Sequence, residues 1–407
     1  MASVLVLDGD TRQCLPVMRA LKARGHSVTV ACPSRLSLGW MSRFPDRKRL
    51  LPSAADHHGE PFIHALHELL VRERPDVTLP LFDPCAHAIA GHRDAWADWT
   101  RIPIVELDTF MLARDKAKTM RVCHLAGVPA PRTWFPEEEP IAEIADRASY
   151  PVLIKPRISH GAVGIVRVDR AADLEAAHAR ISLERGPCIV QEFVPQDGLQ
   201  YKAQFFRAAD GRIHAAVVFE KTRWFPVDGG TSSLNRTVDR PDIIATGRQL
   251  LQAMNWIGYA DIDLIQDTRA GVAKVMEVNP RVTGSVKIAF EAGVDFADLL
   301  VKQALGQPLP TYQGYRVGVS MRYLPLDILW FLYSPDRFRA KPSWFKFWGA
   351  DQCEQVFSWD DPGPFLGLTL DGLRRLMSPT VRAAKLRSKS QGTTTSVPAP
   401  HAGTNDP

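Results

Sequence analysis

The chain has 407 residues, of which 45% are hydrophobic and 23% charged, as in an ordinary globular protein large enough for two or three domains. A net charge of +5, with no block of lysine and arginine interleaved with aromatics, argues against nucleic acid as the main ligand. The six cysteines are scattered without a CxxC pair, which argues against a disulfide framework or a structural zinc site and predicts a reducing, cytoplasmic location.

No segment predicts a membrane span. The start, MASVLVLDGD, reaches an acid at Asp8 without the basic residues or the length of a signal peptide. The most hydrophobic later run, residues 324–333, is far shorter than the roughly 20 residues that a membrane helix needs. We therefore expect a soluble protein with no transmembrane segment.

Residues 1–109 alternate strand and helix patterns. Apolar runs predict strands at 3–8, 26–31 and 77–81, and helical periodicity predicts helices at 11–24, 61–74 and 86–99. This alternation predicts an α/β domain with a Rossmann-like parallel sheet. Ligands of such sheets bind at the carboxyl ends of the strands, so Gly9, Asp10 and Asp83 are candidate substrate contacts, although helix capping explains Asp10 equally well. The absence of GxGxxG after the first strand argues against a nicotinamide enzyme.

Two lysines stand out from residue 110 onward. A helix predicted at 115–125 carries Lys116 in its first turn, where a cation opposes the helix dipole and so suggests an anionic partner. A strand at 150–155 ends in Lys155, and the loop that follows contains Gly161 and Gly164. Backbone N–H groups of such a loop can face phosphate oxygens, although most glycine loops are β-turns.

The middle of the chain predicts further strands and a polar loop. Strands are expected at 187–195, 202–206 and 214–219, and a helix at 243–254. The loop 220–232 combines two cations, two glycines and two hydroxyls, and its candidate substrate contacts are Arg223, Gly230 and Ser232. Such a loop can bind a carboxylic acid or its acyl phosphate, but a solvated turn explains the glycines equally well.

Residues 259–278 predict a hairpin around a turn at 266–271. Because strand side chains alternate between faces, Asp263 and its neighbour Asp261 share one face of the first strand. Glu277 and Asn279 likewise share one face of the second.

Facing acids and an amide oxygen form a set of hard ligands that suits Mg²⁺, or Mn²⁺, carrying phosphates. Arg281, two positions beyond Asn279, can hold an anionic substrate or a transferring phosphoryl group. A solvent-facing hairpin with its acids turned outward is the alternative that this spacing leaves open.

Beyond the hairpin, helices are predicted at 286–292 and 295–305. Residues 311–386 are rich in aromatics, which predicts a small layer over an apolar patch or a docking surface for a partner or a membrane edge. Residues 387–407 are polar and predict a disordered tail.

The pieces occur in one order: Lys116 on a helix, Lys155 before a glycine loop, a sharply turning strand, then Asp263 and Glu277-x-Asn279-x-Arg281. This order resembles the ATP-grasp superfamily over residues 110–310. The resemblance implies a Rossmann-like pre-ATP-grasp domain at 1–109, an α+β ATP-grasp domain at 110–310 with a lid subdomain at about 130–190, and a C-terminal extension. Arg157 and His160 depart from the glycine- and serine-rich lid of the family.

The resemblance also implies roles for individual residues. For ATP binding these are Lys116, Lys155, Gly161, Gly164 and, around the adenine, Gln191, Glu192 and Val194. For magnesium they are Asp263, Glu277 and Asn279. For catalysis they are Arg281, Asn279 and Lys155, and for the substrate Arg223, Gly230, Ser232 and Arg281.

The activity that the resemblance implies is ATP-dependent ligation. A small carboxylic acid is phosphorylated to an acyl phosphate and coupled to an amine, with release of ADP and phosphate. A biotin-dependent carboxylase is disfavoured, because the run after Arg281 holds no glutamate or histidine to deprotonate bicarbonate. The expected partners are a small-molecule acid and an amine, and a dimer is plausible. An ATP-binding regulatory or scaffold protein without turnover, and a membrane-associated assembly factor, are the alternatives.

Overall fold

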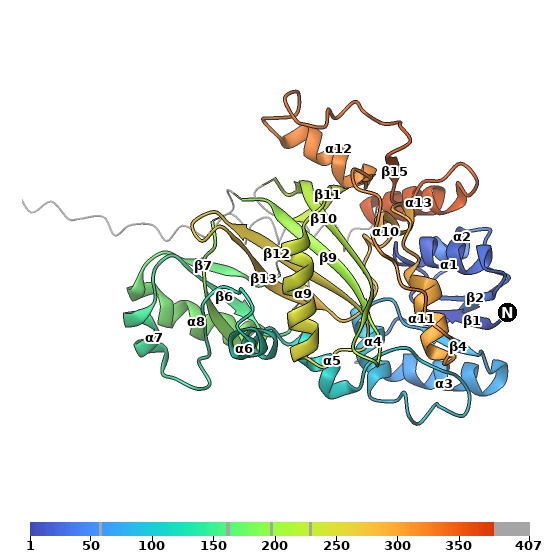
Figure 1. The fold of residues 1–407 in the computed structure, drawn as a ribbon, viewed down its shortest axis with the longest axis horizontal. Helices are drawn as coiled ribbons and strands as arrows, with labels where there is room; N and C mark the ends of the chain where they lie inside the picture. The colour runs from blue at the N-terminus through green and yellow to red at the C-terminus, as the bar shows by residue number, and fades with distance from the viewer. Residues whose placement is uncertain (57–58, 160–162, 196–197, 228–229, 378–407) are drawn as a thin grey trace, which may run out of the picture.

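The computed structural model describes residues 1–56, 59–159, 163–195, 198–227 and 230–377, and three β-sheets organise them (Figure 1). The N-terminal sheet is four-stranded and parallel, in the order β3-β2-β1-β4, as the alternating pattern predicts. Its strands are β1 (Ser3–Val6), β2 (Ser27–Cys32), β3 (Arg47–Leu50) and β4 (Val77–Leu79). Its helices are α1 (Cys14–Ala23), α2 (Leu38–Met41), α3 (Glu60–Glu73) and α4 (Asp83–Ala90).

Helices cover both faces of this sheet because the residues of β1 alternate. Val4 and Val6 pack into the apolar cluster that contains α1, whereas Leu5 and Leu7 pack into the cluster that contains α3. The helix predicted at 86–99 is displaced: α4 begins at Asp83 and ends before Gly91, and residues 91–99 form turns.

A second, smaller sheet lies at the far end of the molecule from the N-terminal sheet (Figure 1). It has the order β5-β8-β6-β7 and is antiparallel. Its strands are β5 (Thr133–Trp134), β6 (Val152–Pro156), β7 (Val166–Val168) and β8 (Cys188–Glu192). The helices α5 (Leu107–Arg114) and α6 (Lys116–Ala126) lead into it, and α7 (Ile141–Arg147) and α8 (Ala171–Arg185) pack on it.

The central sheet is seven-stranded, in the order β13-β12-β9-β10-β11-β14-β15. Its first strands are β9 (Gln200–Arg207), β10 (Ile213–Phe225), β11 (Thr231–Thr237), β12 (Gly258–Asp267) and β13 (Val272–Asn279). The helix α9 (Pro241–Ala253) packs on one face, where Gly247 lies so close to Phe205 that an added Cβ would meet the ring at 2.2 Å. On the other face Phe206 and Val217 join the apolar cluster shared with α1 and α11. The helices beyond the hairpin are α10 (Lys287–Glu291) and α11 (Phe296–Ala304).

The aromatic extension is not a separate layer, because part of it completes the central sheet. β14 (Ser320–Arg322) pairs antiparallel with β11, and β15 (Gln352–Glu354) pairs parallel with β14. The helix α12 (Leu324–Tyr333) lies over this edge, and α13 (Gly363–Met377) packs against α2. Within the described part of the chain no helix is long and apolar enough to span a membrane. The predicted disordered tail, 387–407, lies outside the described residues.

Candidate functional site

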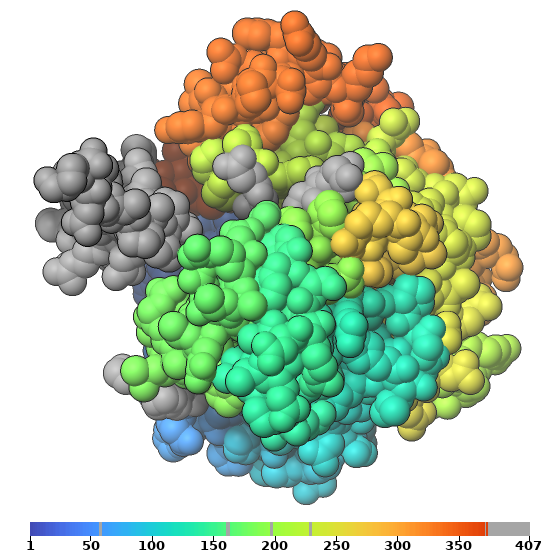
Figure 2. Space-filling model, turned by 90° about the vertical axis from the view of Figure 1, so that its left-hand side faces the viewer, coloured from blue at the N-terminus to red at the C-terminus, as the bar shows by residue number. Residues whose placement is uncertain are grey.

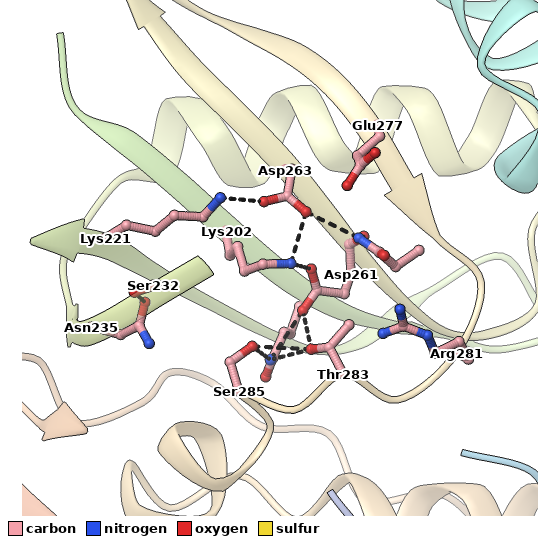
Figure 3. Close-up of polar contacts among 12 residues, drawn as sticks. Lys202, Lys221, Ser232, Asn235, Asp261, Asp263, Glu277, Arg281, Thr283 and Ser285 are labelled. Carbon is pink, nitrogen blue, oxygen red and sulfur yellow. Dashed lines mark hydrogen bonds and ion pairs between the residues drawn. The ribbon is translucent and has the colours of Figure 1, made fainter. Parts of the chain in front are cut away.

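The predicted hairpin forms, and its register brings the acids together. In the antiparallel pair β12–β13, Asp263 lies directly opposite Glu277 and Asp261 lies directly opposite Asn279. The side chains point from neighbouring strands to the same face of the central sheet (Figure 3). Asn279 Nδ2 donates to Asp263 Oδ2 at 3.0 Å. The spacing argument from the sequence is therefore confirmed for the hairpin itself.

Two lysines from the adjoining strands neutralise the acids. Lys202 on β9 donates to Asp261 Oδ1 at 2.6 Å and to Asp263 Oδ2 at 2.7 Å. Lys221 on β10 donates to Asp263 Oδ1 at 2.6 Å. Neither lysine was among the predicted site residues. The signal that could have found Lys202 is a cation in the interior of a predicted strand, beside Tyr201 and Ala203, since a buried charge requires a partner.

The charges in this cluster stabilise one another. Burial alone would raise the pKa of Asp263, but Lys202 and Lys221 outweigh it and hold that pKa well below its usual value. Burial alone would likewise lower the pKa of Lys202, but Asp261 and Asp263 raise it above its usual value. Asp263 and Lys202 therefore both carry their charges in the neutral range.

Asp261 is held more deeply than Asp263. It is fully buried, and its Oδ2 accepts from Thr283 Oγ1 at 2.5 Å and from Gln204 Nε2 at 3.2 Å (Figure 3). Ser285 also lies in this network, through Thr283. Since its oxygens are occupied by protein donors, Asp261 fixes the position of Lys202, whereas the partly exposed Glu277 remains the more accessible acid.

Lys116 and Lys155 lie close to the hairpin acid Glu277. Lys116 begins α6, where Asp115 caps the helix, and its Nζ lies 3.5 Å from Glu277 Oε2. Lys155 ends β6, donates to Gln191 Oε1 at 2.6 Å and feels the charges of Glu277 and Lys116. Burial lowers the pKa of Lys155 to about 8. The two lysines thus converge on the acids from the small sheet and its leading helix.

The loop after Lys155 contains one glycine that the backbone requires. Gly164 has φ +79°, and an added Cβ would approach Pro156 Cγ at 2.9 Å. Gly161 and His160 lie outside the described residues. Arg157, the departure from the family pattern, pairs with Asp115 and with Glu137, so it ties the loop to the first turn of α6.

The residues predicted around the adenine lie on and after β8. Gln191 is buried between Lys155 and Thr133 Oγ1, to which its Nε2 donates at 2.9 Å. Glu192 pairs with Arg269 at 2.6 Å and with Lys274 at 3.1 Å, so its charge is neutralised by two cations. Val194 is buried.

Arg281 connects this site to the N-terminal sheet. Its Nη2 lies 2.5 Å from Asp83 Oδ2, and Asp83 stands at the start of α4, after β4. Asp83 therefore lies beside Arg281, and its contact with a substrate stays a prediction. Gly9 is instead packed against Cys32 and Ala31, where an added Cβ would meet Cys32 Sγ at 2.3 Å, so its role there is packing.

Arg223, a predicted substrate contact, lies away from the cluster of hairpin acids and lysines. Register shifts in β10 on either side of Arg223 turn its side chain away from the face that carries Lys221. Its guanidinium is 2% exposed, lies 3.2 Å from Asp327 Oδ2 on α12 and stacks on Trp330. The prediction that Arg223 contacts a substrate is thus wrong, because a bulge cannot be read from residue spacing.

Of the two other candidates in that loop, Ser232 lies near the acid and lysine cluster and Gly230 has a backbone role. Ser232 lies on the cluster side, where its hydroxyl donates to Asn235 Oδ1 at 2.6 Å, and Asn235 pairs with Lys221 in the strand register (Figure 3). Gly230 is exposed, and an added Cβ would meet the Phe225 carbonyl oxygen at 2.4 Å. Gly230 therefore permits the return of the chain into β11.

We expect Arg223→Met to destabilise the fold by about 3 kcal/mol, because it leaves the fully buried Asp327 with only Arg322 as a cationic partner. Urea unfolding measures this loss. Nucleotide binding by the remaining folded protein should be unchanged. Full stability combined with lost activity would return Arg223 to the substrate site.

The chain resembles known proteins in sequence and in fold. Residues 197–324 match a family model described as ATP-grasp in the biosynthetic pathway with Ter operon. The carbamoyl phosphate synthase large chain of Thermomicrobium roseum is 25% identical over 232 residues, which cover 54% of this chain but only 21% of that protein. The D-alanine–D-alanine ligase of Carboxydothermus hydrogenoformans is 25% identical over 213 residues, 47% of this chain and 68% of the ligase.

A solved structure resembles most of the chain. It is the biotin carboxylase domain of the Hydrogenobacter thermophilus 2-oxoglutarate carboxylase, in complex with MgADP, ADP and bicarbonate. The TM-score is 0.66 at 15% identity, and the match covers 79% of this chain and 73% of that one. At this identity the likeness concerns the fold.

Proposed function

Taking as premise that this chain carries an ATP-grasp domain, we propose that it is an ATP-dependent ligase that joins a small carboxylic acid to an amine. The observation that carries the proposal is the register that sets Asp263 opposite Glu277, with Lys116, Lys155, Lys202 and Lys221 around the pair. Acids and cations gathered around one hairpin suit a polyphosphate and its counter-ion.

The donor set fits a hard divalent cation. Asp263, Glu277 and Asn279 offer oxygen atoms, and Asp263 already balances two ammonium groups, so the cluster tolerates concentrated positive charge. Among the described residues no group of three or more His, Cys, Asp and Glu could hold a metal by itself, which suits a cation that arrives with nucleotide phosphates. Bound there, Mg²⁺ or Mn²⁺ would neutralise charge on the phosphates.

The proposed reaction has two steps. A carboxylate oxygen of the acid forms a bond to the γ-phosphorus while the bond from that phosphorus to the ADP oxygen breaks, which gives an acyl phosphate. The amine then attacks the acyl carbon and phosphate leaves. Lys116 and Lys155 would hold phosphate oxygens, and Arg281 would steady the transferring group after exchanging its contact with Asp83.

Ligation is preferred to carboxylation because of the residues that follow Arg281. The run 282–287 contains no acid or histidine, and its hydroxyls at Thr283 and Ser285 are engaged with Asp261 and with each other. No general base for bicarbonate is therefore available in this run. The likeness to a D-alanine–D-alanine ligase supports an acid and an amine as the substrate classes.

A cytoplasmic location is part of the proposal. The support for it is that all six cysteines carry free thiols, five of them buried.

The test is a matrix of carboxylic acids against amines, with ADP release as the readout. The proposal expects at least one pair for which release needs both components. Nucleotide binding without ADP release for any pair, over a broad panel of amino acids and amines, would favour a regulatory ATP-binding protein instead.

ATP affinity should fall as the pH rises through 8. The pKa of Lys155 is lowered by burial to about 8, so its ammonium is present below that pH and lost above it. Isothermal titration of ATP from pH 7 to pH 9 measures the change, and proton uptake on binding should appear above pH 8. Lys155→Arg, whose guanidinium stays charged, should flatten the profile. A wild-type affinity independent of pH would remove Lys155 from the phosphate site.

A further inference from the structure

An exposed aromatic and basic segment lies outside the proposed site. It consists of α12 and the loop 334–351 that connects it to β15, which we call the aromatic overhang. This part projects from the edge of the central sheet in Figure 1 and stands above the body of the molecule in Figure 2. A loop of this length without secondary structure of its own is uncommon in a compact domain and usually has a function. Nothing in the proposed ligase reaction uses it.

Large apolar side chains of the overhang lie in solvent. Leu332 is 62% exposed, Phe338 73% and Trp348 79%. Other exposed members are Ile328, Tyr333 and Phe345. Single exposed apolar residues are ordinary, but a group of them on one connected segment marks an interaction surface.

The exposed rings are held in place from beneath. Phe331 packs on Trp344 with ring centroids 4.2 Å apart and on Phe338 at 5.5 Å. Trp344 in turn contacts Phe347, whose ring lies under the Arg322 guanidinium. The overhang is thus a packed aromatic cluster whose outermost rings face outward.

A buried charge group fastens the overhang to the sheet. Asp327 on α12 is fully buried between Arg223, 3.2 Å away, and Arg322, 3.3 Å away, and accepts from Ser233 Oγ. Trp344 Nε1 also donates to the Asp327 carbonyl oxygen at 3.1 Å. The role of the buried Arg223 is therefore to pair with Asp327. These contacts also fix the orientation of the aromatic rings relative to the central sheet.

Cations are interleaved with these rings. Arg339, Lys341 and Lys346 are exposed, and Arg337 is partly exposed. The acids of the same loop are Asp336 and Asp351, so the loop has a net charge of +2 from four cations and two acids. Tryptophan and phenylalanine beside lysine and arginine are the side chains that settle at the boundary between lipid headgroups and acyl chains.

We propose that the aromatic overhang docks the protein on an anionic lipid bilayer surface. Phe338, Trp348 and Leu332 enter the headgroup boundary, and Arg339, Lys341 and Lys346 face the anionic headgroups. The contact is peripheral and reversible. It goes beyond the ligase reaction and would locate that reaction at a membrane.

The charge of the overhang favours an anionic bilayer over a second copy of the chain or the C-terminal segment as its binding partner. In a two-fold contact between copies, the overhang of one copy would face the same cations on the other, which is unfavourable. The chain beyond residue 377 carries Arg382, Lys385, Arg387 and Lys389 against the single acid Asp406, so it does not complement a cationic surface. An anionic bilayer complements both the charges and the rings.

Co-sedimentation of the full chain with vesicles tests the proposal. We compare vesicles of phosphatidylcholine alone with vesicles that also contain phosphatidylglycerol, at low and at high salt. Binding should be at least about tenfold stronger to the anionic vesicles and should weaken with salt, because several cations contribute. Phe338→Ala with Trp348→Ala should reduce binding about tenfold or more. Arg339→Gln, Lys341→Gln and Lys346→Gln together should abolish the preference for anionic lipid.

The matched control replaces two isolated surface leucines. Leu125→Ala with Leu183→Ala removes side chains that are each 90% exposed on α6 and α8, and vesicle binding should not change. A second measurement uses the wild-type protein, whose tryptophan fluorescence brominated lipid should quench. Trp348→Phe, which keeps an aromatic ring, should reduce the quenching while binding persists.

Absence of binding to both kinds of vesicle overturns the proposal, as does binding that the overhang variants leave unchanged. If the overhang variants instead convert a dimer to a monomer in light scattering, without lipid binding, the surface is an interface between copies. ADP release with soluble substrates does not depend on any of these outcomes, so failure here leaves the ligase proposal standing.

Discussion

Glu277→Gln should lower acid- and amine-dependent ADP release by at least about 100-fold, because an amide cannot supply the negative charge that a divalent cation and Lys116 require. The substitution preserves the size of the side chain and one acceptor oxygen. Glu277 is 29% exposed, and its buried partner Lys116 keeps hydrogen bonds to the carbonyl and hydroxyl oxygens of Ser159, so the protein should still fold. Initial rates at saturating ATP measure the effect, and a thermal-shift titration shows whether nucleotide still binds.

The matched control is Glu175→Gln, the same change on the exposed surface of α8. It should leave the rate within about twofold of the wild type, in line with surface substitutions away from functional features. A Glu277→Gln protein with full turnover would show that the paired acids of the hairpin do not serve the reaction.

Lys202→Met should destabilise the fold by about 3–5 kcal/mol, because it removes the ammonium that separates the buried Asp261 from Asp263. Methionine is similar to lysine in volume, so the expected destabilisation comes from the missing charge. Urea denaturation measures the free energy of unfolding of the variant and the wild type. Lowering the pH should narrow the difference between variant and wild type: the wild-type Asp263 has a depressed pKa, so its stabilising effect is present above its unfolded pKa of about 4 and lost below it.

Magnesium distinguishes an ion site from a purely structural ion pair. Millimolar Mg²⁺ should raise the melting temperature of Lys202→Met more than that of the wild type, because a divalent cation can take the place of the missing ammonium. Lys22→Met is the matched control, since Lys22 pairs with Asp46 at the surface, where 30% and 40% of the two side chains are exposed, and its loss should cost at most about 1 kcal/mol without magnesium dependence. Equal magnesium responses in all these proteins would mean that the cluster does not bind the ion.

Local periodicity was sufficient to predict the hairpin. A two-residue alternation predicts which side chains of each strand share a face, such as Asp261 with Asp263. The pairing next to the turn would place Asp263 opposite Met276, and a register shift between Asp263 and Leu264, which spacing does not reveal, brings Asp263 opposite Glu277. The helix that presents Lys116 was equally predictable, since Asp115 caps it and Gly127, with φ +65°, ends it.

Contacts between distant segments could not be predicted in this way. Lys202 and Lys221 reach Asp263 only because β9 lies beside β12 in the central sheet and β10 lies beside β9, and sequence spacing contains no information on strand order. The register shifts on either side of Arg223 turn its side chain to the other face of the sheet, and no residue type in this segment predicts them. β14 and β15 are three residues each, too short for a periodic pattern to reveal.

The account depends most directly on phosphoryl transfer to a carboxylate. With an acid and amine pair that supports ADP release, the acid is supplied with ¹⁸O in its carboxylate and the released phosphate is examined by mass spectrometry. The account predicts that one ¹⁸O atom per turnover appears in the phosphate, because the acyl phosphate carries the carboxylate oxygen away. Phosphate free of ¹⁸O, with normal product formation, would contradict it.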